Sequence, residues 1–517
     1  MKLPGESFEF AKKHIENYYD SDFFPKPLEF RAIFSLWDEV KAYLCTNDVN
    51  TFIVECPLAY AVPKHSRGYR IAHQLDPMNS LIYTAFAHFI AEDVEKNRIP
   101  VDEKVACSYR INLDANGNFF AKGTGYNDFA TKSLELAKTY NFVLQTDITD
   151  FYNQIYLHRL QNSIAICSPK LKVISGEIER FIIDINNKVS KGVPVGPAAS
   201  IIMAEVLLSD IDQFILTKGY EYTRYVDDFR IFSNSNFDLK FLIHELTNYL
   251  YDNHRLTLEG SKTKIFETSK FIKNELLDPE AIEKEEVEKE INKLNLRVIN
   301  FYSEFEDILS ETEVSSDDKF KAQGEAFKKL MHEILSKDYF DLGLARHILR
   351  RSKKLRSRAI IPQLLDNLDY FAPAIRDVIL YLDSVTNEKM IEMNKDRFIA
   401  LLDKSEAIKF PYFKYWMEYY FSTHKGFFNY PKIRQFILTT TNIRNSALYA
   451  ETSKSVYWVR QYKNKLFCLG AWEKRAIMLA SKVLSKDERD NWMENVERNT
   501  NNFLDKVIAK FIRSLNE

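Results

Sequence analysis

The sequence has few cysteines and no long uninterrupted hydrophobic run. Its five cysteines are scattered, with no pair at the Cys-x-x-Cys spacing. This argues against a disulfide framework and a zinc site, and it is typical of reduced thiols in the cytoplasm. No stretch reaches the roughly 18 apolar residues that a membrane span needs, and the first residues contain no apolar signal region. We therefore expect a soluble cytoplasmic protein with no membrane partner.

An excess of charge of one sign is also missing. Across 517 residues, 71 Lys and Arg stand against 73 Asp and Glu, which is a formal net charge of −2. A protein that grips a long duplex generally carries a basic surface, so any contact with nucleic acid is expected to be local. The length predicts two to four domains, and the hydrophobic content of 45% is ample for their cores.

Two adjacent carboxylates stand between two β-rich runs. The segment Tyr225-Val226-Asp227-Asp228 separates residues 220–224 from residues 229–232, which predicts a hairpin with both aspartates at its tip. A second strand-like run, residues 142–146, ends at Asp147. Ordinary turn chemistry is the alternative interpretation of the Asp-Asp pair, because Asp is favoured in turns.

Carboxylates that converge from separate strands are ligands that hard divalent ions prefer. Two such ions about 3.5–4 Å apart stabilise both the attacking and the leaving oxygen when a hydroxyl attacks an α-phosphate. Asp147 and Asp227 are the expected metal ligands, Asp228 adds negative charge, and the backbone carbonyl of Ile148 completes the coordination. The pattern predicts nucleotidyl transfer with two Mg²⁺ ions, in which Asp147, Asp227 and Asp228 are the catalytic residues.

A loop rich in glycine and proline lies between the two carboxylate sites. It covers residues 191–200 and opens an apolar helix over residues 201–216, which should end at Lys218-Gly219 because Gly commonly follows a helix end. Further on, residues 256–258 predict a short strand, followed by Lys262 within reach of a triphosphate. Strand, helix, loop, helix and carboxylate hairpin follow one another in the order of a polymerase palm.

These motifs together resemble those of the reverse transcriptases, over roughly residues 60–270. The resemblance implies an α+β fingers and palm domain, assigned to residues 1–275, that makes DNA from dNTPs. In that family an aromatic residue five positions after the first metal carboxylate excludes the ribose 2′-hydroxyl, and Tyr152 matches it, with a core aromatic as the alternative. The basic residues 64–71 resemble the fingers segment that contacts the triphosphate, although a basic loop is often only solvated. The implied nucleotide-binding residues are Arg70, the weaker candidates Lys64 and Arg67, Tyr152, Pro194, Gly196 and Lys262.

Three positions depart from the template-directed members of that family. Val195 stands where a Gln is usual, Ile201 where a second Pro is usual, and Glu259 where an Asn is common. No primer-grip segment is recognised after Phe266. Since these losses affect groups that handle template and primer, synthesis without a template is expected.

Beyond residue 275 the strand pattern disappears. Residues 280–293 are a highly charged helical run, residues 315–318 suit the cap of the next helix, and about ten helices are expected from Phe320 onward. We interpret residues 276–517 as an all-α helical-repeat domain of HEAT-like type, with a plain helical bundle as the alternative. A cationic cluster in this region is a candidate groove for a single DNA strand, or a solvated surface. It comprises Arg346, Arg350, Arg351, Lys353, Lys354, Arg356 and Arg358.

A polymerase palm followed by a helical half, with weakened template motifs, resembles the bacterial abortive-infection (Abi) reverse transcriptases, the AbiK/AbiA-like lineage. The resemblance implies anti-phage defence, untemplated DNA synthesis primed by a tyrosine of the protein, a single-stranded DNA product attached to the chain, and a homo-oligomer. Tyr18, Tyr19 and Tyr43 are the candidate priming residues, with packing as the alternative for each.

Two other hypotheses stay open. One is a templated RNA-directed DNA polymerase of a retron-like defence system. The other is a non-polymerising scaffold whose helical half binds a phage protein or nucleic acid. Clustered carboxylates argue against the scaffold, because their mutual repulsion is relieved only by metal.

Overall fold

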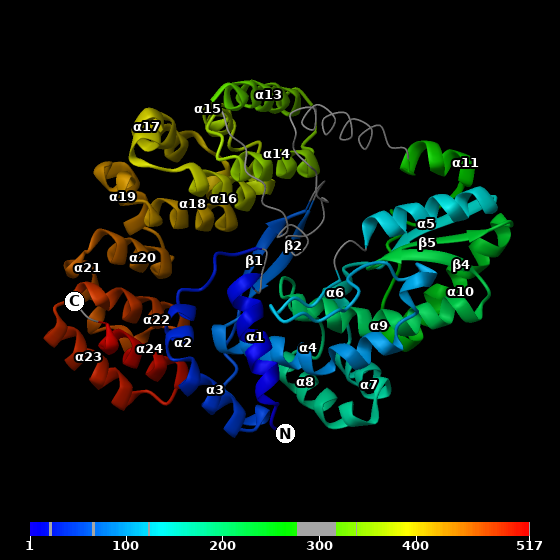
Figure 1. Ribbon diagram of the computed structural model, residues 1–517, viewed down its shortest axis with the longest axis horizontal. Helices are drawn as coiled ribbons and strands as arrows, with labels where there is room; N and C mark the ends of the chain where they lie inside the picture. The colour runs from blue at the N-terminus through cyan, green and yellow to red at the C-terminus, as the bar shows by residue number, and fades with distance from the viewer. Residues whose placement is uncertain (20–22, 65–67, 122–124, 277–316, 338, 516–517) are drawn as a thin grey trace.

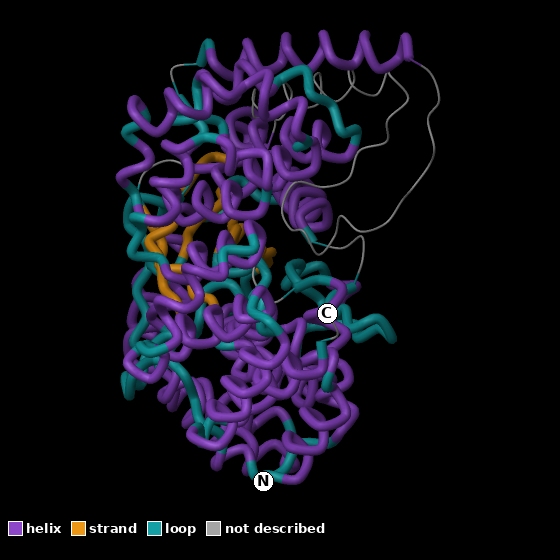
Figure 2. The backbone as a smooth tube through the Cα atoms, turned by 90° about the vertical axis from the view of Figure 1, so that its left-hand side faces the viewer, coloured by secondary structure: helices purple, strands orange, loops and turns teal. Residues whose placement is uncertain are grey.

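The computed structural model describes residues 1–19, 23–64, 68–121, 125–276, 317–337 and 339–515. Among them, helices form most of the structure and the strands lie near its middle (Figure 2). Figure 1 shows a strand-containing part on one side and a curved row of helices on the other. The charged run at 280–293 and the first two residues of the expected cap, Ser315 and Ser316, lie outside the described residues.

A four-stranded antiparallel sheet, the palm sheet, carries the predicted carboxylates. Its strand order is β4-β5-β3-β6, so the hairpin β4-β5 pairs with the earlier strand β3. The strands are β3 (Phe142–Asp147), β4 (Glu221–Tyr225), β5 (Asp228–Ser233) and β6 (Lys264–Glu267).

The two faces of the palm sheet are covered by different helices. Leu144 of β3 and its cross-strand partner Ile231 belong to the large first core, against α9 (Ala198–Thr217) and α10 (Asn236–His254). The next pair along the strands, Val143 and Phe232, packs with α5 (Tyr126–Thr139) and α11 (Thr268–Phe271) on the opposite face. Alternation of apolar residues to both faces explains why the strands read as continuous hydrophobic runs.

Several predicted elements are confirmed and one is wrong. The strand at 142–146 and the hairpin are present, and α9 ends at Thr217 with Gly219 at a φ of 79° just beyond it. Helix α9 begins at Ala198, three residues earlier than predicted. Residues 256–258 form no strand; Leu258 makes only an isolated bridge to Ile148, and the strand begins at Lys264.

The N-terminal segment and the fingers region surround the palm. Helix α1 packs on α4, and α4 packs on α9. The hairpin of strands β1 (Leu58–Pro63) and β2 (Tyr69–Gln74) stands apart from the palm sheet. The remaining helices of this half are α1 (Gly5–Asn17), α2 (Phe30–Ser35), α3 (Trp37–Thr46), α4 (Pro77–Asn97), α6 (Phe151–Gln154), α7 (Leu157–Cys167) and α8 (Lys172–Ile185).

After residue 316 the described chain is helical. Helices α14, α16, α18, α20, α22 and α24 each pack against the next in that series, so they form one continuous row, curved in Figure 1. The helices are α13 (Asp317–Leu335), α14 (Leu342–Lys354), α15 (Ile361–Asp366), α16 (Ile375–Val385), α17 (Glu388–Lys404), α18 (Pro411–Thr423), α19 (Pro431–Leu438), α20 (Ile443–Ser453), α21 (Val456–Lys463), α22 (Ala471–Ala480), α23 (Lys486–Asn499) and α24 (Phe503–Ser514). Stacking of every second helix is typical of a solenoid, whereas the HEAT-like type stays a prediction.

The two larger hydrophobic cores draw residues from each side of residue 275. The first core contains the palm residues together with apolar residues of α20 to α24, from Ala447 to Ile512. The second core contains the helices α13 to α19 together with Phe24, Val62 and Ala72 of the N-terminal half. The boundary at 275 therefore stays a prediction about chain segments, and the packing crosses it twice. In the described part of the chain, no helix is long and apolar enough to cross a membrane.

Candidate active site

The carboxylates of the two motifs meet at one end of the palm sheet. Asp147, the last residue of β3, is the register partner of Asp228, the first residue of β5. Tyr225 pairs with Asp228 across the β4-β5 hairpin, which leaves Val226 and Asp227 as the turn. Because directly opposed residues of an antiparallel pair share a face, Asp147 and Asp228 lie on the same face.

The environment of these carboxylates disfavours negative charge in the absence of a cation. Burial, followed by the charge of Asp147, raises the pKa of Asp227 well above its usual range. Burial also raises the pKa of Asp228 to about 6, with the charge of Asp147 adding to the effect. Lys262 forms an ion pair with Asp147, the only direct cationic partner of that carboxylate among the described residues. The site is electrostatically suited to a divalent cation.

The donor set fits Mg²⁺ if substrate completes it. Among the described residues, no three His, Cys, Asp or Glu side chains gather closely enough to hold a metal by themselves. Mg²⁺ is usually held by one or two carboxylates together with substrate phosphates, so Asp147 and Asp227 are a sufficient protein contribution. The N–H of Thr149 donates to the Thr257 carbonyl, and the carbonyl of Asp147 accepts from the N–H of Glu259, so both groups point toward the segment of residues 257–259. Because backbone groups alternate in direction along a strand, the N–H and carbonyl of Ile148 point the opposite way, toward the β4-β5 hairpin.

Tyr152 lies beside the carboxylates, five residues after the end of β3. It belongs to the short helix α6, and its backbone carbonyl accepts a hydrogen bond of 2.9 Å from the N–H of Val193. Burial raises the pKa of the Tyr152 hydroxyl well above its usual value, and the charges of Tyr109 and Asp227 raise it further. The Tyr152 side chain is therefore near Asp227. If the phosphates of a nucleotide bind at the carboxylates, the sugar of that nucleotide would lie next to this side chain.

The glycine-proline loop is held against this helix. Gly192 has a φ of 89°, and a Cβ there would lie 3.1 Å from the carbonyl oxygen of Asn153, so a side chain would crowd the loop. The loop continues through Pro194 to Gly196, whose φ is 134°. Val195 is tied to the fingers hairpin, since its carbonyl accepts from the N–H of His73 and its N–H donates to the His73 ring.

The fingers candidates lie on both sides of the β1-β2 turn. Arg70 is on β2; burial and then the charge of Arg346 lower its pKa, while Asp227 acts in the opposite direction. Lys64 lies close enough to Glu259 to help lower the pKa of that carboxyl, after the hydrogen bonds from Ser261 and the charge of Lys262. Arg67 lies outside the described residues.

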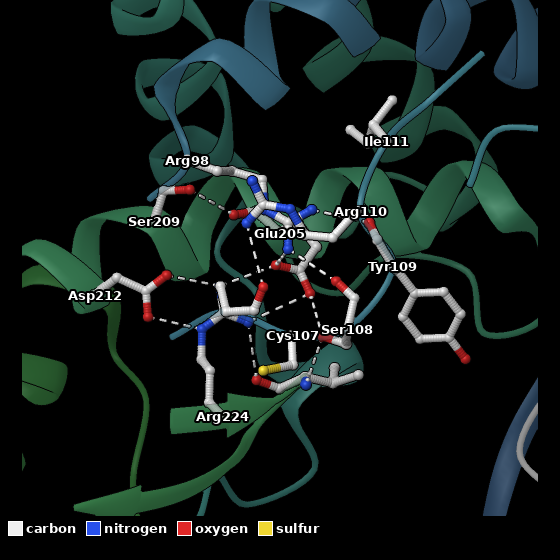
Figure 3. A network of polar contacts seen from close by, with 12 residues as sticks. Arg98, Cys107, Ser108, Tyr109, Arg110, Ile111, Glu205, Ser209, Asp212 and Arg224 are labelled. Carbon is white, nitrogen blue, oxygen red and sulfur yellow. Dashed lines mark hydrogen bonds and ion pairs between the residues drawn. The ribbon is translucent and has the colours of Figure 1, made fainter. Parts of the chain in front are cut away.

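An ion network beneath the hairpin is the main feature that the sequence analysis missed (Figure 3). Arg224 on β4 forms paired hydrogen bonds with Asp212, both 2.7 Å, and with Glu205, 3.3 and 2.9 Å, and all three side chains are at most 1% exposed. Arg98 also reaches Glu205 at 2.8 Å. The available signal was the pair of acidic residues at i and i+7, Glu205 and Asp212, on the largely apolar helix α9, a spacing that places both on one face.

This network reaches the catalytic turn through two hydrogen bonds. Val226 has a φ of 52°, a strained conformation for a β-branched residue. Its N–H donates to Ser108 Oγ at 2.8 Å, and its carbonyl accepts from Arg224 Nη1 at 3.2 Å. Ser108 Oγ in turn donates to Glu205 Oε1 at 3.0 Å. Hydrogen bonds from Ser108 and Arg224 to the Val226 backbone thus hold the strained turn that carries Asp227.

The candidate priming tyrosines are placed elsewhere in the chain. Tyr19 Oη donates to the Pro25 carbonyl and accepts from Gln74. Tyr43 of α3 stacks on Phe503 of α24 at a ring separation of 3.7 Å. Burial raises the pKa of Tyr18, with Asp114 as the nearby charge.

The cationic cluster does not form one exposed face. Arg346 and Arg350 both contact the buried Asp377, at 3.0 and 3.3 Å. Arg351 is buried, whereas Lys353 is exposed. Arg358 donates to the Val385 carbonyl. Part of the cluster is therefore structural, and a groove for a single DNA strand stays a prediction that concerns its exposed members.

Comparison with known proteins identifies the domain that holds this site. Residues 62–289 match the family described as reverse transcriptase (RNA-dependent DNA polymerase), so the chain contains a reverse transcriptase domain. Members of this family generally use divalent metals, typically Mg²⁺. No curated protein matches the chain.

Among solved structures, the chain is similar to telomerase from Candida albicans in complex with a TWJ fragment of telomeric RNA. The identity is 11% and the TM-score 0.32, over 72% of this chain and 69% of that chain. It is also similar to apo telomerase from Candida tropicalis, with 12% identity and a TM-score of 0.29, over 74% of each chain.

Proposed function

We propose that this protein is a DNA polymerase of the reverse-transcriptase type that acts in abortive infection, synthesises DNA from dNTPs without a template and starts from a tyrosine of its own chain. The observation that carries the proposal is the meeting of Asp147 with Asp227 and Asp228 next to Tyr152, within a reverse transcriptase domain. This arrangement supports nucleotidyl transfer, in which a hydroxyl oxygen bonds to the α-phosphorus and the bond to pyrophosphate breaks.

Each residue has a separate part in that reaction. Asp147 and Asp227, with the Ile148 carbonyl, would hold Mg²⁺, which when bound stabilises the attacking and leaving oxygens. Lys262, which pairs with Asp147, would turn to the triphosphate when the nucleotide binds. Arg70 supplies a planar guanidinium for phosphate oxygens. Tyr152 closes the sugar site and favours the deoxyribose.

Synthesis without a template is supported by what stands in the template region. The Val195 backbone is engaged by His73, and Val195 offers no side-chain amide to a template base. Glu259 accepts hydrogen bonds from Ser261 and puts a carboxylate where template-directed members commonly have an Asn, so the amide is missing there. A protein primer is compatible with the chemistry, because a phenol replaces a 3′-hydroxyl as nucleophile once a metal lowers its pKa.

The decisive experiment is synthesis by the purified protein with Mg²⁺ and labelled dNTPs, without template or primer. The matched control is Asp227→Asn. We expect label to migrate with the wild-type protein on a denaturing gel and, after protease, to run as DNA with a peptide remnant. Incorporation only after addition of RNA and a primer would favour a templated, retron-like enzyme.

The second readout is phage defence in cells. Asp227→Asn is expected to abolish both polymerisation and defence while the fold persists. Defence that survives this change in a folded protein, together with no incorporation under any condition, would favour a binding scaffold instead.

A further inference from the structure

His73 of β2 joins the fingers hairpin to the glycine-proline loop of the palm. Its N–H donates to the Val195 carbonyl at 2.8 Å, and its ring Nδ1 accepts from the Val195 N–H at 3.1 Å. Because the Val195 N–H is the donor, Nδ1 carries no proton, which fixes the neutral ring with its proton on Nε2. Burial lowers the pKa of His73 and so favours this neutral form. One residue of the hairpin therefore engages both backbone polar groups of Val195.

The face of the hairpin that carries His73 is largely exposed. Because side chains alternate along a strand, His73 shares this face with Ile71 and with their cross-strand partners Ala59 and Ala61. Ile71 is 44% exposed, and both alanines are exposed as well. Ala72, which points to the other face, is fully buried in the second core. On the side of His73, the attachment of the hairpin to the loop therefore rests on hydrogen bonds more than on buried apolar area.

On its other side the loop is fixed to helix α6. The N–H of Val193 donates to the Tyr152 carbonyl at 2.9 Å, and Val193 itself is only 2% exposed. Pro194 is the single residue between Val193 and Val195, and its ring restricts φ. A displacement of Val195 is therefore passed on to the contact that holds Tyr152.

We propose that His73 is a positioning residue for nucleotidyl transfer. It holds the glycine-proline loop between the fingers hairpin and helix α6, so that the Tyr152 ring stays at the sugar of the incoming nucleotide. His73 acts through Val195 and the loop, without touching the reacting atoms. The inference rests on the proposed function, because that function places the nucleotide sugar beside Tyr152.

The test compares His73→Phe with His73→Asn. Phe keeps a planar ring but has a carbon in place of Nδ1, so the Val195 N–H loses its acceptor. Asn carries Oδ1 at the corresponding position and keeps an acceptor. The matched control is His88→Phe, which removes another half-buried histidine, whose Nδ1 is hydrogen-bonded to Ser7 Oγ at 3.0 Å. Thermal melting verifies that each variant is folded.

The first readout is amide hydrogen exchange in peptides that contain Val195. Exchange should be faster in His73→Phe than in wild type, His73→Asn and His88→Phe, because the Val195 N–H is no longer protected. This readout needs no catalysis, so it tests the hydrogen bond whether or not the protein is a polymerase. Equal exchange in wild type and a folded His73→Phe protein would overturn the inference.

The second readout is the preference for dATP over ATP. It is measured as a ratio of kcat/KM values in incorporation, and without chemistry as a ratio of dissociation constants for α,β-imido analogues of the two nucleotides. In His73→Phe the preference should fall by about 3- to 10-fold, less than in Tyr152→Ala, because the ring is still present. His73→Asn should keep most of the preference, and His88→Phe should match wild type.

A double variant distinguishes positioning from a separate effect on stability. His73→Phe combined with Tyr152→Ala should discriminate as Tyr152→Ala alone does, because the effects of residues that act through one another are not additive. Additive losses in the double variant would overturn the positioning role. An unchanged preference in a folded His73→Phe protein whose Val195 amide exchanges faster would also overturn it.

The outcome for the proposed function is separate. If wild type incorporates no dNTP, the proposed function fails, while the amide exchange and the ratio of analogue binding still decide the role of His73. The two failures are therefore distinguishable.

Discussion

At the scale of single residues, the carboxylates combine a catalytic position with a cost to stability. Asp227 is buried next to Asp147, and both effects raise its pKa, which means that its charged form is disfavoured in the folded protein without metal. Such a residue is retained for what it binds, because a neutral side chain would be more stable in the same place.

The first prediction concerns Asp227→Asn. Incorporation of dNTPs should fall by about 10³-fold or more, because loss of metal-based charge stabilisation is worth several kcal/mol. The melting temperature without Mg²⁺ should be equal to or higher than that of wild type, since a buried like-charge contact is removed. A variant that melts well below wild type would contradict this account.

The second prediction concerns Tyr152. Tyr152→Ala should reduce discrimination between dNTPs and rNTPs by about 10- to 100-fold, because the ring no longer meets the 2′-hydroxyl. Tyr152→Phe, which keeps the ring, is the matched control and should discriminate as wild type does. Competition between labelled dATP and ATP measures the ratio, and an unchanged ratio in Tyr152→Ala would assign the ring to packing alone.

At the scale of elements, the catalytic hairpin depends on groups outside it. The strained conformation of Val226 costs of order 1–3 kcal/mol and persists only when its surroundings hold it. Ser108 and Arg224 provide that hold through the two backbone groups of Val226. These residues position Asp227 without touching the reacting atoms.

The third prediction is that Ser108→Ala lowers incorporation by about 10- to 100-fold while stability falls by only about 1–3 kcal/mol. The Mg²⁺ concentration for half-maximal activity should rise, because Asp227 is no longer held in one place. Ser446→Ala, which removes another buried hydroxyl bonded to the Ile437 carbonyl, is the control that should lose stability but not activity. Equal effects of the two variants on activity would argue against a positioning role.

Helix α1 is attached to the loop of residues 114–118 by a neutral histidine. His14 Nδ1 donates to the Gly117 carbonyl at 2.8 Å, and burial lowers the pKa of His14 to about 4. The unfolded chain, with an ordinary pKa near 6.5, binds the proton more readily. The contribution of His14 to stability is therefore complete above pH 6.5 and declines as the pH falls toward 4.

The fourth prediction follows from that sign. Between pH 7.5 and pH 5.5, titration of His14 should cost about 1.3 kcal/mol of unfolding free energy. In urea denaturation, the unfolding free energy of His14→Gln should therefore fall by about 1.3 kcal/mol less than that of wild type between pH 7.5 and pH 5.5. His332→Gln, at an exposed position, should behave as wild type, and an unchanged pH dependence in His14→Gln would exclude this residue as the cause.

At the scale of the whole molecule, the end of the chain completes the core that begins at its start. Arg475 of α22 forms buried ion pairs with Asp76, next to α4, and with Asp505 of α24. Arg444 of α20 pairs with the buried Glu29 beside α2. The row of helices is thus attached to the polymerase part at its far end, and in its middle α18 packs on strand β1 of the fingers hairpin.

The fifth prediction is that residues 1–440 do not fold by themselves, because truncation exposes the part of the first core that α20 to α24 cover. Thermal melting should show no cooperative transition, and co-expression of residues 441–517 should restore it. Within the full chain, Arg475→Met should cost about 3–5 kcal/mol, since it removes the cation from the buried Asp76 and one of the two cations from the buried Asp505. A soluble, cooperatively melting 1–440 fragment would show that the two halves are independent.

The agreement between sequence and structure differs from element to element. The hairpin at 225–228 and the strand ending at Asp147 were predictable, because alternation and turn residues are local signals. Residues 256–258 were predicted to be a strand because they alternate apolar and polar residues. They form only an isolated bridge, since so short a run is an ambiguous signal. The cationic cluster was interpreted as a candidate groove or a solvated surface, and neither interpretation includes Asp377, which is distant in sequence and pairs with two of its arginines.

The amino-acid sequence by itself determined the chemistry that this protein offers: carboxylates on two strands in the order of a polymerase palm, an aromatic residue five positions after the first, and a helical second half. These features are local, because each depends on a few neighbouring residues. Only the tertiary structure decided that Arg224, Glu205 and Ser108 hold the strained turn and that α20 to α24 complete the first core. Contacts between segments hundreds of residues apart depend on packing and buried charge, which no local pattern records.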